Sequence, residues 1–389
     1  MTATYTPHRL STLFKMSFNM DEWYLFIKNL FGADKLEEQP ARIIGSNADD
    51  SFYLGSIGTS DNRRIGLFHC NTSIPPQNRR RELRHIVKRI ESTCNGLNAA
   101  LVVSQSNSNW SLSFIYGIDN PAAEPRRSTF VFGNKNLSYR TAVDRFSFLL
   151  ERGASFGNIK EAFSADSLSN EFFDRYREQY ADFIQHTTGK RLVRRGKKWE
   201  ERILGEPDGR LMQAFGHDEM RARSYVKRMM AQITLLHFLQ CKGWLCGNAN
   251  FVQEMFESSG YKDDFLVSVL EPLFFGIINT RPEEREALFE ERGWDKSLLD
   301  KWNGIPYLNI GILEPDREER IKIKFPAGYF GRLLQFLDEY TFTVEENSPF
   351  DAEVGIDPEI FGRIFENLLE DNKEKGTFYT PKYIVRYMC

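Results

Sequence analysis

Two hydrophobic periods follow each other along the first 138 residues, one typical of helices and one typical of strands. Apolar residues recur at helical spacing from Leu10 to Phe31. Gln77 to Cys94 has the same period, with one apolar face. The other runs are short, and we expect five strands: Phe52–Ile57, Arg64–Cys70, Asn98–Ser104, Trp110–Tyr116 and Ser128–Phe132. Strands interrupted by a helix of this length predict a mixed sheet flanked by helices.

Beyond Tyr139 the strand pattern ends, and the chain is predicted to be mainly helical. Tyr225 to Leu245 is apolar on nearly every side, which predicts a buried central helix that ends at Lys242 and Gly243. We interpret His237 within it as a core histidine rather than a ligand. The predicted fold class is therefore α+β, with a mixed sheet followed by a mainly α-helical domain.

Two segments concentrate positive charge. On the helix predicted from Gln77, four basic side chains share the side opposite the apolar face: Arg80, Arg81, Arg84 and Lys88. The second segment surrounds Gly196, is predicted to be an exposed loop or a frayed helix, and has six basic residues in nine: Lys190, Arg191, Arg194, Arg195, Lys197 and Lys198. For both segments the sequence allows two interpretations: a solvated surface, or a surface that contacts DNA phosphates.

The end of the chain predicts a helix that leads into an aromatic turn. Asp357 can cap this helix, Pro358 fits its first position, and its apolar stripe is Phe361, Ile364, Phe365, Leu368 and Leu369. After a polar run comes Gly376-Thr-Phe-Tyr-Thr-Pro381. Read locally, Thr380 and Pro381 are the N-cap and first residue of a further helix.

That turn resembles motif X of N6-adenine DNA methyltransferases, and the helix before it resembles the one that precedes motif X in single-chain type IIG/IIS restriction–modification enzymes. Further segments similar to this family are Ala162–Tyr176, Leu235–Leu245, Ile305–Leu313 and Phe336–Glu345. The resemblance implies that S-adenosylmethionine is the cofactor, and that five residues face it: Thr377, Phe378, Tyr379, Thr380 and Pro381.

The first domain is similar to the nuclease domain of these enzymes, which has the PD-(D/E)XK fold. That resemblance implies an acid on one strand and Glu-x-Lys on the next, which hold Mg²⁺ and activate water. Here His69 stands at the Glu position and Asn71 at the Lys position, and Asp61, or one of Asp49 and Asp50, stands for the first acid. We therefore expect a degenerate cleavage site, with a variant metal site or a shifted strand register as the alternative.

Composition adds few constraints. With 41% hydrophobic and 27% charged residues, 389 residues suffice for two or three globular domains. The net charge of −3 argues neither for nor against DNA. The sequence has no apolar run that could span a membrane and no signal-peptide pattern. Five scattered cysteines fit a reducing cytoplasm, and the close pair Cys241 and Cys246 has no matching pair for zinc.

Together these features predict three parts: a nuclease-like domain over 1–138, a helical connector over 139–350, and the lead-in helix with motif X over 351–389. The sequence contains neither a glycine-rich cofactor loop nor an Asn-Pro-Pro-Tyr loop, so we expect an N-terminal part of a longer DNA adenine methyltransferase that binds double-stranded DNA. Two alternatives stay open. One is an active metal-dependent endonuclease domain, and the other is a non-enzymatic DNA-binding scaffold of a phage-defence methyltransferase.

Overall fold

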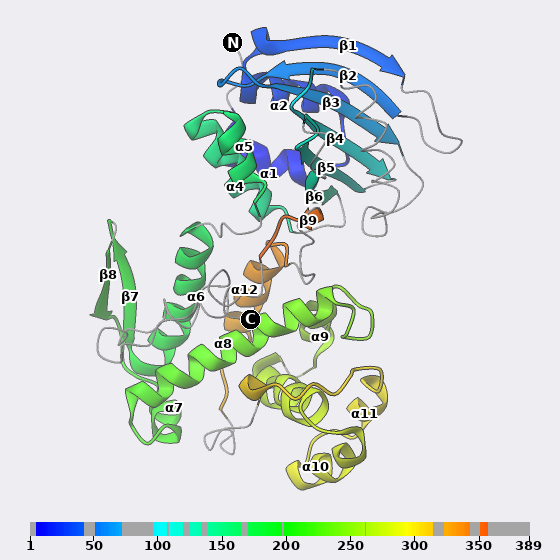
Figure 1. The fold of residues 1–389 in the computed structure, drawn as a ribbon. Coiled ribbons are helices and arrows are strands. Elements are labelled where there is room, and N and C mark those ends of the chain that lie inside the picture. The colour runs from blue at the N-terminus through cyan, green and yellow to red at the C-terminus, as the bar shows by residue number, and fades with distance from the viewer. Residues whose placement is uncertain are drawn as a thin grey trace, which may run out of the picture. The chain divides into compact units, whose positions relative to one another are not determined.

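The computed structural model describes residues 5–42, 51–71, 96–106, 109–119, 125–133, 138–164, 170–196, 198–260, 262–313, 323–342 and 351–356. They fall into two compact units (Figure 1). The first, which we call the sheet unit, holds the described residues up to 164 together with 338–356. The second, the helical unit, holds those from 170 to 337.

The sheet unit is built on a mixed seven-stranded sheet in the order β1-β2-β3-β4-β5-β6-β9. Its strands are β1 Leu36–Arg42, β2 Ser51–Gly58, β3 Arg64–Asn71, β4 Ala99–Ser106, β5 Asn109–Tyr116, β6 Arg126–Gly133 and β9 Asp351–Glu353. The pairs β3–β4 and β6–β9 are parallel and the others antiparallel. All five predicted strands are confirmed, with ends that differ by at most two residues. The described residues confirm the mixed α+β class, and the helix predicted over 77–94 lies outside them.

One face of the sheet carries the main core of this unit. Four helices pack there, as Figure 1 shows: α1 Pro7–Lys15, α2 Met20–Phe31, α4 Arg140–Arg152 and α5 Phe156–Ala162. The helical pattern predicted from Leu10 to Phe31 is therefore two helices. The indole of Trp110 on β5 donates from Nε1 to the backbone oxygen of Met16 at 3.1 Å, and Asn19 caps α2 through the backbone N–H of Glu22. A partly buried hydrogen bond and a helix cap thus fix the break between the helices.

The division into two units differs from the predicted boundary at residue 138. Helices α4 and α5 belong to the same core as the sheet, so the first unit extends beyond that boundary. The chain also returns to this unit after residue 337. There the backbone N–H of Arg140 donates to the backbone oxygen of Glu339 at 2.9 Å, and the hydroxyl of Thr341 donates to the backbone oxygen of Ser138 at 3.1 Å. Strand β9 then pairs with β6.

The helical unit surrounds one long buried helix. Its α-helices are α6 Asn170–Thr188, α7 Gly209–Ala214, α8 Glu219–Cys241, α9 Phe251–Ser258, α10 Arg285–Arg292, α11 Ser297–Lys301 and α12 Ala327–Asp338. Helix α8 confirms the prediction of a central buried helix, and Lys242 is its C-cap. His237 is buried, with Nδ1 3.2 Å from the backbone oxygen of Ile233, so it is a core histidine as expected.

Shorter helical segments complete the described fold. Leu266–Leu270 and Pro272–Ile278 form π-type turns, and Ala33–Lys35, Lys262–Asp264, Pro282–Glu284 and Gly311–Leu313 form 3₁₀ turns. Within the ranges given above, no helix combines the length and apolarity needed to cross a membrane.

The basic segment around Gly196 is a β-hairpin. Strands β7 Lys190–Arg195 and β8 Lys198–Ile203 pair antiparallel, so the prediction of a loop or frayed helix is wrong. The prediction that no strands follow Tyr139 is wrong for the same reason. Gly189 and Gly196 bracket β7 in left-handed conformations, with φ of +74° and +64°. Figure 1 shows the hairpin at one side of the helical unit, beside α6.

Candidate nuclease-like and DNA-contacting sites

His69, the residue expected at the metal-binding Glu position, lies in an apolar part of the sheet. It pairs with Phe52 of β2 and Val103 of β4, and it is 7% exposed. Its ring stacks on Phe18, with centroids 5.2 Å apart and planes 16° apart. Burial lowers the pKa of the imidazole, although the Gln105 side chain acts in the opposite direction. Nε2 has no hydrogen-bond partner among the described residues, so the position suits a neutral ring.

Asp61, the candidate for the first acid, lies at the opposite end of β3 from His69. It sits in the turn between β2 and β3, and its Oδ1 accepts from Thr59 Oγ1 at 2.6 Å and from the backbone N–H of Phe156 at 3.0 Å. Desolvation raises its pKa, but these hydrogen bonds outweigh that effect and hold it below the ordinary value. This carboxylate anchors the start of α5.

Among the predicted nuclease residues that are described, Asp61 and His69 lie at opposite ends of β3 and are not brought together. His69 stands five positions after Arg64, where β3 begins, and five positions correspond to about 16 Å along a strand. Asn71 ends the same strand and is exposed. Asp49 and Asp50 lie outside the described residues. Among the residues that are described, no three His, Cys, Asp or Glu side chains gather in a way that could hold a metal ion.

Some of the other sites predicted from the sequence lie within the described residues, and some lie outside them. The basic helix positions Arg80, Arg81, Arg84 and Lys88 and the motif X positions Thr377, Phe378, Tyr379, Thr380 and Pro381 lie outside the described residues. So does Lys197, while Lys198 is described only as part of β8. Lys190, Arg191, Arg194 and Arg195 all lie on β7. Of the two predicted DNA-contacting segments, only the β7–β8 hairpin therefore has side-chain contacts that the structure describes.

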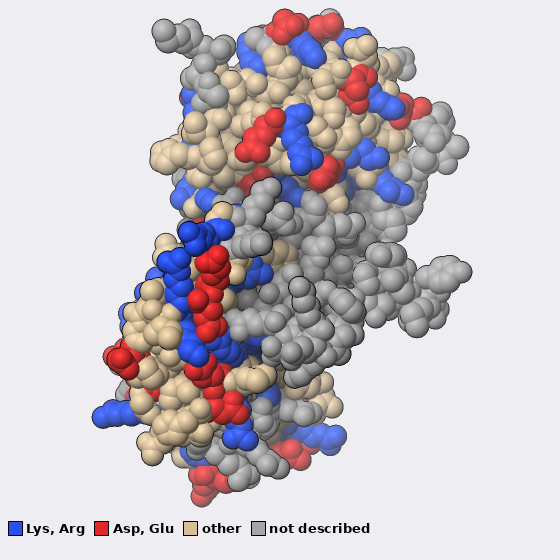
Figure 2. Space-filling model, turned by 90° about the vertical axis from the view of Figure 1, so that its left-hand side faces the viewer, with Lys and Arg blue, Asp and Glu red and all other residues tan. Residues whose placement is uncertain are grey.

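Most of the predicted basic residues on β7 have close acidic partners on neighbouring helices. Lys190 Nζ lies 2.7 Å from Glu219 of α8, and Arg194 lies 2.6 Å from Asp174 of α6. Arg191 pairs with Asp182 of α6. Figure 2, which views the molecule from the hairpin's side, shows basic and acidic side chains in adjacent columns over this unit. These pairs fasten the hairpin to the helices and cancel much of its charge.

Two exposed arginines of the hairpin differ from that pattern. Arg195 and Arg202 are each 3.9 Å from Glu200, and no carboxylate of the described residues lies closer to either guanidinium. Arg202 was not among the residues predicted from the sequence. The sequence gives no clear strand signal there, because Glu201 stands between Trp199 and Ile203 on the side that would otherwise be apolar.

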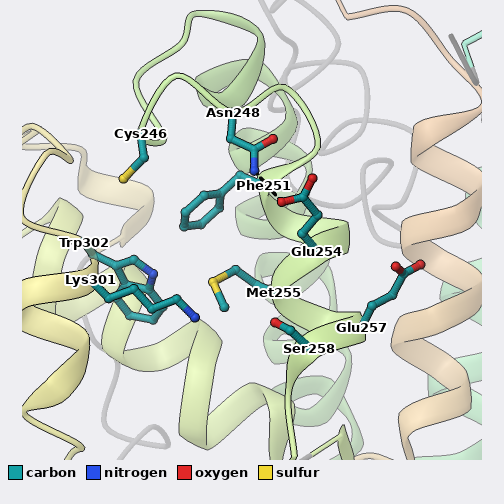
Figure 3. A pocket seen from close by; sticks show the side chains of 9 residues that line it. All are labelled: Cys246, Asn248, Phe251, Glu254, Met255, Glu257, Ser258, Lys301 and Trp302. Atoms are coloured by element: carbon teal, nitrogen blue, oxygen red, sulfur yellow. Dashed lines mark hydrogen bonds between the residues drawn. The ribbon is translucent and has the colours of Figure 1, made fainter. Parts of the chain in front are cut away.

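The helical unit also contains a pocket of about 600 Å³. Figure 3 shows its lining: Cys246, Asn248, Phe251, Glu254, Met255, Glu257, Ser258, Lys301 and Trp302. Asn248 Nδ2 donates to Glu254 at 2.6 Å. Trp302 is fully buried, and its Nε1–H has no acceptor among the described residues. Charged groups thus surround an apolar floor, and the sequence predictions include none of these residues as a site. Cys241 and Cys246 are both exposed.

Comparison with known proteins relates this chain to restriction–modification enzymes. Over 180 residues it is 27% identical to a provisionally named type II restriction enzyme and methyltransferase of Methanocaldococcus jannaschii. The similarity covers 44% of this chain and 14% of the relative, so the chain matches only a small part of that protein's length. No family model matches the chain, and no solved structure does.

Proposed function

We propose that these residues form the nuclease-like and connector part of a restriction–modification enzyme that methylates adenine N6 in DNA with S-adenosylmethionine. Similarity to the type II restriction enzyme and methyltransferase is the observation that carries this proposal. The resemblance of Thr377–Pro381 to motif X supports adenine as the target and S-adenosylmethionine as the cofactor. Those residues lie outside the described ones, so the cofactor proposal rests on their sequence. The role assigned to this part is to hold double-stranded DNA.

We also propose that the sheet unit does not cut DNA. Magnesium-dependent cleavage needs two or more carboxylates at one edge of the sheet, where they hold the ion and activate water. His69 offers a buried imidazole at the expected Glu position, and the carboxylate of Asp61 is occupied at the other end of β3. This arrangement supports a DNA-holding domain over an active endonuclease domain. The proposal that the sheet unit holds DNA without cutting it is the same if the whole protein is a scaffold of a phage-defence methyltransferase.

Plasmid nicking tests this proposal. Supercoiled plasmid incubated with the chain and Mg²⁺ or Mn²⁺ is expected to stay supercoiled, because no described group of carboxylates can hold the ion. The Asp61→Ala variant is a matched control for a contaminating nuclease. Nicking that the wild-type chain performs and the Asp61→Ala variant lacks would show an active metal site and refute the proposal. Equal nicking by both would point to the contaminant or to carboxylates other than Asp61, and substitution of Asp49 and Asp50 would separate the two.

A further inference from the structure

The two faces of the β7–β8 hairpin carry different sets of side chains. Residues opposite each other in an antiparallel pair project to the same face, and neighbours along a strand project to opposite faces. The first face therefore carries Lys190, Leu192, Arg194, Trp199, Glu201 and Ile203. The second face carries Arg191, Val193, Arg195, Glu200 and Arg202.

Contacts with α6 and α8 occupy most of the first face. Lys190 pairs with Glu219, and Arg194 pairs with Asp174. The guanidinium of Arg223 on α8 is nearly buried and lies 2.8 Å from Glu201. On the same face, Arg177 of α6 stacks over the ring of Trp199 at 5.1 Å. These partly buried pairs fix the hairpin on the helices, so the basic residues of the first face are structural.

The second face keeps two guanidiniums open to solvent. The side chains of Arg195 and Arg202 are 72% and 53% exposed, and that of Glu200, which lies between them in sequence, is 44% exposed. Each guanidinium is 3.9 Å from the Glu200 carboxylate, too far for a hydrogen bond. Exposed pairs of this kind contribute little stability, so another anion can replace the carboxylate at low cost.

We propose that the second face of the hairpin binds the phosphate backbone of duplex DNA through Arg195 and Arg202. This inference rests on the proposed function and assigns a DNA contact within it. A guanidinium presents a planar fork of donors that matches phosphate oxygens, and its charge stays on at any physiological pH. The two-stranded ribbon is also narrow enough to lie along the major groove with its arginines on the flanking phosphates. Glu200 is the anion that DNA displaces.

Neutralising the two arginines is the first test. Fluorescence anisotropy of a labelled 30-base-pair duplex, titrated with the 389-residue chain at several salt concentrations, gives the Kd and its salt dependence. Arg195→Gln/Arg202→Gln is expected to raise the Kd about tenfold or more and to reduce the salt slope by about 2. Arg281→Gln/Lys296→Gln removes the same charge from exposed positions near α10 and α11, and it should leave both quantities nearly unchanged.

Removing the competing carboxylate should act in the opposite direction. Glu200→Gln is expected to lower the Kd about threefold, because it frees both arginines and removes repulsion between the hairpin and phosphate. If wild-type protein binds duplex DNA and neither hairpin variant changes the Kd, the assignment of this face is wrong while the proposed function stands. If the wild-type chain binds no duplex DNA at low salt, the proposed DNA-holding function fails, and this inference fails with it.

Discussion

Gly189→Ala is expected to destabilise the helical unit by about 3 kcal/mol or more, since an L side chain is strained at this φ before any clash is counted. Gly189 has φ +74°, and a Cβ there would lie 2.3 Å from the backbone oxygen of Gly205. That oxygen belongs to a close crossing of two backbones at the base of the hairpin. The N–H groups of Leu204 and Gly205 both donate to the backbone oxygen of Gly189, at 2.9 and 3.1 Å. The crossing therefore has no room for a methyl group.

The glycine that follows β7 gives a matched control. Gly196 has nearly the same φ of +64°, but nothing lies within 4 Å of the position of its Cβ. Gly196→Ala should cost only the backbone strain, about 1 kcal/mol. Urea unfolding combined with hydrogen exchange of the peptide around Leu204 would compare the two. Equal losses of stability would mean that the close crossing at the base of the hairpin does not exist.

His69→Glu is expected to destabilise the sheet unit by about 4 kcal/mol, although it restores the residue type that a nuclease would carry. The side chain at this position is 7% exposed, stacks on Phe18 and has the uncharged side chain of Gln105 beside it, so an ionised carboxylate would lose its hydration without gaining a cation among the described residues. Burial raises a carboxyl pKa by several units, and about three units corresponds to this free energy. A cleavage site cannot be rebuilt at position 69 alone.

His69→Gln is the control for this prediction. Glutamine has nearly the same size as glutamate and no charge, so the difference between the two variants isolates the cost of the buried charge. Chemical denaturation at pH 7 and at pH 5 measures it. The Glu variant should regain stability relative to the Gln variant on acidification, because the protonated form of a group with a raised pKa is the one that the fold accepts. Equal stability of the two variants at pH 7 would show that position 69 is open to water or to a cation.

The central strands were predictable from the sequence because their burial alternates or is complete. Leu101 to Val103 is apolar and buried on β4, and Trp110, Leu112 and Phe114 of β5 project into the core that also holds Leu101 and Val103. The edge strands were not predicted. Strand β1 reads Leu-Glu-Glu-Gln-Pro-Ala-Arg, whose polar residues and proline are typical of a sheet edge and give no hydrophobic period.

The hairpin was missed for a different reason. Both of its faces carry charged residues, so β7 and β8 show no contrast between apolar and polar positions. Their acidic partners, among them Asp174, Asp182 and Glu219, are 9 to 29 residues away in the sequence. A local pattern cannot reveal such pairs, and a basic segment then looks like a uniform DNA-binding loop. The structure separates its basic residues into those that fasten the hairpin and those that remain open.

The candidate cleavage site shows the same limit of local reasoning. Strand β3 was predicted with nearly correct ends: His69 lies on it as expected, and Asn71, one residue beyond the predicted end, is its last residue. Asp61 lies in the turn where β3 begins, whereas His69 and Asn71 lie near its other end. The sequence pattern could not show that this places the candidate acid far from them. The contacts of Asp61 with Thr59 and Phe156 place it with α5.

The most direct test of the central claim is the appearance of N6-methyladenine in DNA. The whole gene that encodes these residues would be expressed in a bacterial host without adenine methylation, and the host genome would be read by single-molecule sequencing. The proposed function predicts N6-methyladenine at one recurring sequence, and its loss when Pro381 and the preceding turn of Thr377–Thr380 are deleted. A genome without methylated adenine, despite soluble expression of the full protein, would contradict the assignment to a DNA adenine methyltransferase.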